Sequence, residues 1–101
     1  MITRVWQGWT SATDAGRYEA HYRDEVLSTL RAVAGFRGAR LLRRTVGDET
    51  EFVSVTTFDD LDAIRGFAGD DFETAVIAPA ARAVLVRFDE TVRHFDTAFE
   101  V

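Results

Sequence analysis

The fold of this chain is decided between Phe67 and Asp89, where the sequence reads FAGDDFETAVIAPAARAVLVRFD. Gly69 ends a helical pattern, because glycine readily adopts the backbone conformation that closes a helix. Acidic residues follow this glycine and begin the next segment. Pro79, the only proline, suits the first turn of another helix. The apolar residues that follow lead into a final strand at Phe88-Asp89. This stretch therefore returns the chain from a helical layer to a sheet.

On both sides of this stretch, hydrophobic periodicity divides the chain into strands and helices. The predicted strands are Ile2–Thr10, Phe36–Thr45, Glu51–Phe58 and Thr91–Glu100, with a hairpin turn at Val46–Glu49. The predicted helices are a long one from the cap residues Thr10–Asp14 to about Ala34, Leu61–Ala68, a short turn within Phe72–Ile77, and Ala80–Leu85. This order, β-α-β-β-α-β, predicts one α+β domain over residues 1–101. Its class is ferredoxin-like, with a four-stranded antiparallel sheet and helices on one face.

The first strand indicates that both faces of the sheet must be covered. Trp6 and Trp9 have opposite parity, so their side chains lie on opposite faces. Helices cover one face only, and a domain of 101 residues leaves much apolar surface near water. A second copy of the same sheet is the simplest cover for the other face. We expect a two-fold homodimer packed sheet to sheet, the arrangement of a dimeric α/β barrel, with one internal pocket in each subunit.

Composition excludes several classes of function. The formal charge of −5 and a pI near 4.9 argue against nucleic acid, because phosphate binding needs clustered cations. No apolar run is long enough to span a membrane, so we expect a cytoplasmic protein with no membrane partner. With no Lys and no Cys, a Schiff base, a thiol nucleophile and a cysteine metal site are impossible. Asp70, Asp71 and Glu73 fit helix capping, so we expect no metal. The sequence has no Gly-rich phosphate loop and no dinucleotide fingerprint, and we expect no cofactor.

A set of short motifs then suggests a family. The sequence has WQGWT at 6–10, GFRGA at 35–39, FDDLDAI at 58–64, Phe67-Ala-Gly69 followed by Asp71, then Pro79, Leu85, Phe88-Asp89 and His94-Phe95. Together these resemble the antibiotic biosynthesis monooxygenase family of dimeric α/β barrels over nearly the whole chain. The resemblance implies a role such as those of its members: cofactor-independent oxygenases that convert aromatic polyketide phenols or anthrones into quinones, haem-degrading enzymes, and proteins of unknown role.

The chain departs from the site patterns of that family. Its described oxygenases use an Asn and a Trp near a Tyr, and its haem degraders use an Asn, a Trp and a His. This sequence contains no Asn, and its 67–72 region has Phe where an indole or a phenol is expected. Neither of these two sets of site residues can therefore be assigned to positions of this chain. Gln7 is the only side-chain amide and could replace the missing carboxamide, or it could be a surface residue of the first strand.

Oxygenation without a cofactor needs a dry aromatic pocket, a base with a pKa near neutral, and a donor for the developing oxyanion. His94 is the candidate base, because histidine titrates in the useful range. The alternative is a histidine that only packs in the sheet or at the dimer contact. Tyr22, on the buried stripe of the long helix, is the candidate hydrogen-bond partner, with Tyr18 beside it. His21 falls on the charged side of that helix, so we expect it to be solvated.

Aromatic side chains and one arginine complete the predicted site. Trp6, Trp9, Phe67 and Phe72 are expected to form its walls, although each of them could simply pack in the core. Arg65 could hold a substrate carboxylate or phenolate, or could pair with Asp62 or Asp71 at the surface.

The function expected from sequence is a cofactor-independent monooxygenase acting on an aromatic, polyketide-like small molecule. The alternative is a non-catalytic dimer, associated with small-molecule binding or stress. A cyclase or isomerase that uses the same pocket without oxygen also fits.

Overall fold

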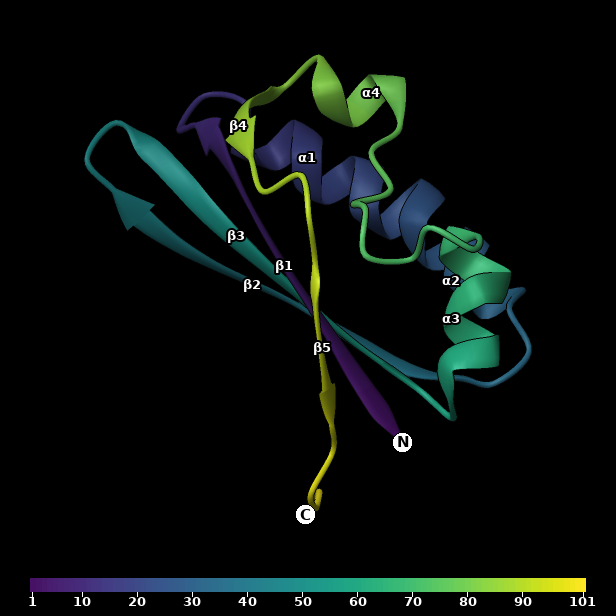
Figure 1. The fold of residues 1–101 in the computed structure, drawn as a ribbon. Coiled ribbons are helices and arrows are strands. Elements are labelled where there is room, and N and C mark those ends of the chain that lie inside the picture. Colours follow the sequence, from purple (N-terminus) through teal and green to yellow (C-terminus); the bar gives the residue numbers. More distant parts are fainter.

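The computed structural model describes residues 1–101 as an α+β fold of the ferredoxin-like class, as expected (Figure 1). The strands are β1 (Ile2–Ser11), β2 (Phe36–Val46), β3 (Glu49–Phe58), β4 (Leu85–Phe88) and β5 (Arg93–Asp96). The helical segments are α1 (Ala15–His21), the π-helical η1 (Tyr22–Val26), α2 (Leu27–Arg31), α3 (Leu61–Ala68) and α4 (Pro79–Arg82). All the helices lie on one side of the sheet (Figure 1). None of them is long and apolar enough to cross a membrane.

The antiparallel sheet has the order β2-β3-β1-β4, and β5 also pairs with β1. β4 lies beside the end of β1, where Gly8 faces Phe88, and β5 lies beside its start, where Arg4 faces His94. The position of the fourth strand is therefore filled by two short strands, and the predicted strand over 91–100 is shorter than expected. The sheet of the single chain stays open. β2 and β3 form the predicted hairpin, and Gly47, at φ 60°, provides the positive φ of its two-residue turn.

The two faces of the sheet differ as the parity of β1 predicts. Trp6 and its alternate neighbours Arg4 and Thr10 are buried under the helices, together with Phe52 and Phe58 of β3. The opposite parity places side chains on the uncovered face. Trp9, Val5, Val53 and Val55 lie there half-buried.

The long helix runs from Ala15 to Arg31, slightly shorter than predicted, and contains a π-helical segment. Its inward residues Tyr18, Tyr22, Val26 and Leu30 are spaced four apart. Residues four apart in a regular α-helix drift by about 40° at each step, because one turn takes 3.6 residues. In η1 the N–H of Leu27 bonds to the carbonyl of Tyr22, five residues back, and this wider turn offsets the drift. All four side chains therefore face the sheet.

The deciding stretch is less regular than the sequence suggests. Residues 72–77 form no helical turn; Thr74 makes only an isolated bridge with Thr91. The helix at Pro79 ends at Arg82, so Leu85 begins β4 rather than ending a helix. Residues 69–78 form an irregular connection, here named the strap. Two backbone bonds fix it to the chain before β5, Ala75 N to Glu90 O and Val92 N to Glu73 O, each 2.8 Å.

Candidate functional site

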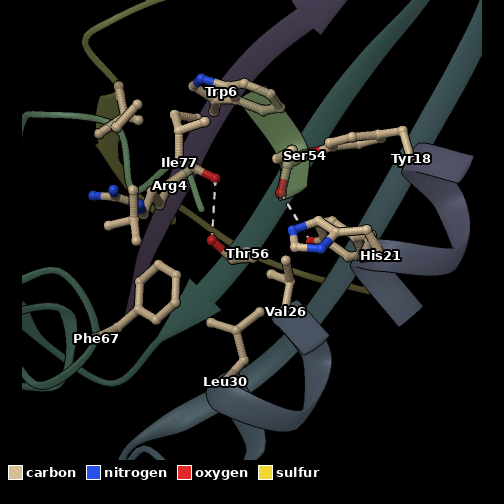
Figure 2. Close-up of a pocket in the computed structure, with 15 residues that line it drawn as sticks. Arg4, Trp6, Tyr18, His21, Val26, Leu30, Ser54, Thr56, Phe67 and Ile77 are labelled. Atoms are coloured by element: carbon tan, nitrogen blue, oxygen red, sulfur yellow. Dashed lines mark hydrogen bonds between the residues drawn. The ribbon is translucent and has the colours of Figure 1, made fainter. Parts of the chain in front are cut away.

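A cavity of about 60 Å³ lies between the sheet and its helical cover (Figure 2). Its floor is formed by β1 and β3, its wall by the long helix, and its roof by the strap, α4 and Val92. The lining residues are Arg4 and Trp6 from β1, Ser54 and Thr56 from β3, Tyr18, His21, Tyr22, Val26 and Leu30 from the helix, and Phe67, Ala75, Val76, Ile77, Ala81 and Val92. Most are apolar, and a few polar groups converge on the space, which is typical of small-molecule sites.

Trp6 is held in place by its own strand. Its indole lies across Gly8, where an added Cβ would stand 2.4 Å from the ring. The indole Nε1 donates a hydrogen bond to the carbonyl of Asp89 at 2.8 Å, and the ring centroid lies 6.2 Å from that of Tyr18. Trp6 is therefore a fixed part of the cavity floor.

Tyr22 provides a buried hydroxyl bonded to the sheet. Its oxygen lies 2.9 Å from the hydroxyl of Ser54. Burial raises the pKa of Tyr22, and its hydrogen bond with Ser54 opposes this only in part. Burial also raises the pKa of Tyr18, with a further contribution from Tyr22. Both phenols therefore stay protonated near neutral pH and can donate a hydrogen bond.

The prediction that His21 is solvated is wrong. Only 8% of its side chain is exposed, and its ring faces the cavity beside Tyr18. The reason is geometric, because residues three apart share a helix face, and Tyr18 already faces the sheet. Nδ1 lies 2.9 Å from a carboxylate oxygen of Glu25. This close contact lacks the direction of a hydrogen bond, so Nδ1 has no hydrogen-bond partner.

Arg4 lies on the other side of the cavity from His21 (Figure 2). It is 5% exposed, and its guanidinium carbon lies 5.7 Å from the centre of the Phe67 ring. Its Nη1 donates to the carbonyl of Phe72 and to Nε2 of His94, at 2.5 and 3.0 Å. Its Nη2 makes a longer contact of 3.4 Å with the carbonyl of Thr74. Arg4 therefore ties β1 to the strap.

His94, the base expected from sequence, does not line the cavity. It lies on the same face of the sheet as Arg4 but behind it, with Phe72 packed edge-on at 5.4 Å between ring centroids. Because arginine can only donate, Nε2 of His94 must be the acceptor and its lone pair is occupied. Burial lowers the pKa of His94, Arg4 lowers it further, and Glu73 acts in the opposite direction.

The other expected site residues divide into two groups. Trp6, Tyr18, Tyr22 and Phe67 line the cavity. Trp9 lies on the uncovered face with the guanidinium of Arg87 4.6 Å from its ring centre. Arg65 is paired with Asp62 at 2.9 Å on the outer side of α3, and it also covers the ring of Phe72.

The sequence interpretation did not include four polar lining residues: Arg4, His21, Ser54 and Thr56. Strand parity carried the signal for three of them. Arg4 has the parity of Trp6, and Ser54 and Thr56 have that of Phe52. No group of three or more His, Cys, Asp or Glu side chains is placed to hold a metal ion.

The fold and the cavity define a small α+β protein with a mostly apolar site between an open sheet and its helices. The family profile described as antibiotic biosynthesis monooxygenase matches residues 1–78. The chain therefore belongs to the antibiotic biosynthesis monooxygenase family. No curated protein matches the sequence.

Several solved structures share the fold. SnoaB from Streptomyces nogalater, described as a cofactor-independent oxygenase, is 21% identical with a TM-score of 0.69, over 99% of this chain and 95% of its own. A putative antibiotic biosynthesis monooxygenase from Bacillus cereus is 11% identical, also with a TM-score of 0.69, over 100% and 96%. MhuD from Mycobacterium tuberculosis, a heme-degrader solved with two hemes bound in its active site, is 21% identical with a TM-score of 0.62, over 100% and 99%.

Proposed function

We propose that this protein is a cofactor-independent monooxygenase that oxidises an aromatic, polyketide-like small molecule in the cytoplasm. The observation that carries the proposal is the cavity, in which the Tyr22–Ser54 hydroxyl pair meets aromatic walls in a member of this family. The similarity of fold to the cofactor-independent oxygenase SnoaB supports the same reaction type.

The reaction would proceed with the substrate as the only electron donor. For an anthrone, a base removes a proton from the methylene carbon, and the resulting carbanion transfers an electron to O₂. Recombination forms the C–O bond of a peroxide, and loss of water leaves a carbonyl. One oxygen atom enters the quinone and the other leaves as water, so the four electrons taken up by O₂ all come from the substrate. A phenol of Tyr22 would donate to the developing oxyanion.

Two histidines are candidates for the base, and their surroundings favour His21. The His21 ring faces the cavity, and a carboxylate oxygen of Glu25 lies 2.9 Å from its Nδ1. His94, proposed from the sequence, would act only if a ligand drew Arg4 away from its Nε2. Trp6, Tyr18 and Phe67 serve as walls in this proposal. Trp9, Arg65 and Phe72 do not line the cavity and would affect substrate binding only indirectly. Trp9 would act through the dimer contact, and Phe72, with Arg65 over its ring, would act through the position of the strap.

A fused-ring substrate requires the cavity to open. Ligand pockets usually measure about 300 Å³ or more, several times the space described here. The strap is the element best suited to move, because it belongs to no helix or strand and two backbone bonds and the contacts of Arg4 are what hold it. Its residue Val76 is already half-exposed. We propose that its outward shift admits the substrate.

Oxygen uptake with a panel of anthrones and hydroquinones tests the function. We expect the wild type to consume O₂ above the rate of autoxidation, with one O₂ for each anthrone converted. Val26→Phe, which fills the cavity, should abolish uptake, whereas Val86→Phe on the exposed side of β4 should leave it unchanged. Absence of uptake with every substrate, or full activity of a folded Val26→Phe protein, would refute the proposal.

The second candidate function is that of a non-catalytic, small-molecule-binding or stress-associated dimer, whose cavity holds a small apolar ligand. Its support is the small size of the cavity and the absence of Asn from the sequence. It predicts that a ligand of the panel binds without oxygen uptake under air.

We also propose that the protein acts as a homodimer packed through the uncovered sheet face. Trp9, Val5, Val53, Val55 and the half-exposed Phe95 of β5 lie on that face. Analytical ultracentrifugation at micromolar concentration should give the mass of a dimer for the wild type and of a monomer for Trp9→Glu. A folded wild-type monomer under these conditions would contradict the proposal.

A further inference from the structure

Arg4 differs from every other arginine of the chain. Seven arginines form ion pairs with carboxylates, and the remaining four, Arg31, Arg40, Arg82 and Arg93, are exposed to water. Arg4 alone is buried, at 5% exposure, without an ion pair. A buried charge without a counter-ion is costly, so such groups are usually paired or bind a charged ligand.

The neighbours of Arg4 do not neutralise it. Its assigned acceptors are two backbone carbonyls and Nε2 of His94, all uncharged. Glu73, the nearby carboxylate, is exposed and forms no ion pair with Arg4. Burial lowers the pKa of Arg4 to about 10, so the guanidinium still carries its charge at neutral pH. This part of the cavity wall therefore presents a net positive charge.

The donors of Arg4 are only partly used. A guanidinium has five N–H groups, and the two N–H groups of Nη1 donate to the carbonyl of Phe72 and to Nε2 of His94. One N–H of Nη2 makes the long contact with the carbonyl of Thr74. The second N–H of Nη2 and the N–H of Nε have no acceptor within the protein. Nε–H and Nη2–H form one edge of the guanidinium, and such an edge binds both oxygens of a carboxylate.

We propose that Arg4 binds the carboxylate of an aromatic ligand in the cavity. The ring system would lie along Phe67 and Trp6, and the carboxylate would take the free edge of Arg4. This inference rests on the proposed function only in placing the ligand in this cavity; the choice of a carboxylate rests on Arg4. The sequence suggested Arg65 as the residue that binds a substrate carboxylate, and we now propose Arg4 of β1 for that role.

A purely structural role, in which Arg4 only anchors the strap, makes a different prediction. An anchoring arginine would affect stability and the binding of all ligands alike. A carboxylate-binding arginine instead discriminates between ligands that differ only in charge. Matched ligands therefore separate the two roles.

The test compares anthraquinone-2-carboxylate with anthraquinone-2-carboxamide, titrated calorimetrically without oxygen. We expect the wild type to bind the carboxylate about tenfold more tightly or better, as charged hydrogen bonds of this kind provide. Arg4→Gln should reduce the preference to less than about twofold, and Arg4→Lys should keep part of it. Arg17→Gln, which changes an exposed arginine of α1, should keep the full preference.

Equal binding of the two ligands by the wild type would overturn the inference, as would binding of neither. A preference that persists in Arg4→Gln would do the same. If that variant fails to fold, the wild-type comparison and Arg4→Lys still decide. A protein that prefers the carboxylate but consumes no O₂ keeps this inference and loses the proposed function. A protein that consumes O₂ but does not prefer the carboxylate keeps the proposed function and loses this inference.

Discussion

The two ends of the cavity hold their polar groups in different ways. At one end, the long helix presents His21 and Tyr22, and the Tyr22 hydroxyl bonds to that of Ser54 on the sheet. Phe52 packs against Tyr18 there, with 4.8 Å between the ring centroids. At the other end, β1 presents a charged guanidinium whose contacts run to the backbone of an irregular strap. The first end is packed into regular elements, whereas the second depends on the irregular strap, whose outward shift we propose above. We infer that the helix end carries the chemistry and the Arg4 end selects and admits the ligand.

The largest expected effect contrasts the two histidines. His21→Ala should lower kcat for O₂ uptake by about a hundredfold or more, the usual effect of losing a general base. His94→Ala should lower it by less than about tenfold, because its ring lies behind Arg4. Steady-state kinetics with circular dichroism as the folding control make the comparison. The reverse order of effects would return the base to His94.

A smaller effect is expected at the hydroxyl pair of the helix end. Tyr22→Phe leaves the partly buried hydroxyl of Ser54 without its partner, which should cost about 1 kcal/mol of unfolding free energy. Adding Ser54→Ala should recover part of this loss, because neither group then lacks a partner. Urea denaturation of the wild type, both single variants and the double variant measures the coupling. Additive effects would show that the pair contributes nothing to stability.

The smallest effect concerns pH and the Arg4 end. The pKa of His94 is lower in the folded protein than its ordinary value of 6.5, so the unfolded chain binds the proton more readily. Stability is therefore fully retained above pH 6.5 and falls as the pH drops from there towards the folded pKa. Arg4 and Glu73 are the charged groups that influence His94.

Urea midpoints measured between pH 8 and pH 5 should fall slightly more for the wild type than for His94→Gln. The difference between the two proteins isolates this histidine, because all other groups are shared. An equal fall in both proteins would mean that His94 has the same pKa in the folded and unfolded states.

The amino-acid sequence predicted most of the fold and four of the fifteen residues that line the cavity. Parity in β1 separated Trp6 from Trp9, and the buried stripe of the long helix placed Tyr18 and Tyr22 towards the sheet. These predictions succeeded because backbone geometry fixes side-chain direction within regular elements.

Three kinds of feature could not be read in this way. His21 was misplaced because charged neighbours suggested a solvated face, although its spacing from Tyr18 indicated the opposite. The division of the last strand into β4 and β5 depends on pairing with β1, which no local pattern records. The burial of Arg4 was missed because an arginine in a strand is ordinarily assigned to the surface, and its partners are backbone groups some 70 residues away.

The π-helical segment Tyr22–Val26 takes up one residue more than an α-helical turn would. Removing one residue from it would convert the segment to α-helix and leave the residues beyond it on nearly the same face, because three α-helical turns need about eleven residues. Leu30, which is fully buried, would then stay in the core on the same face as Tyr18. Homologues that keep both contacts can therefore have either the wide turn or a one-residue deletion within residues 22–26.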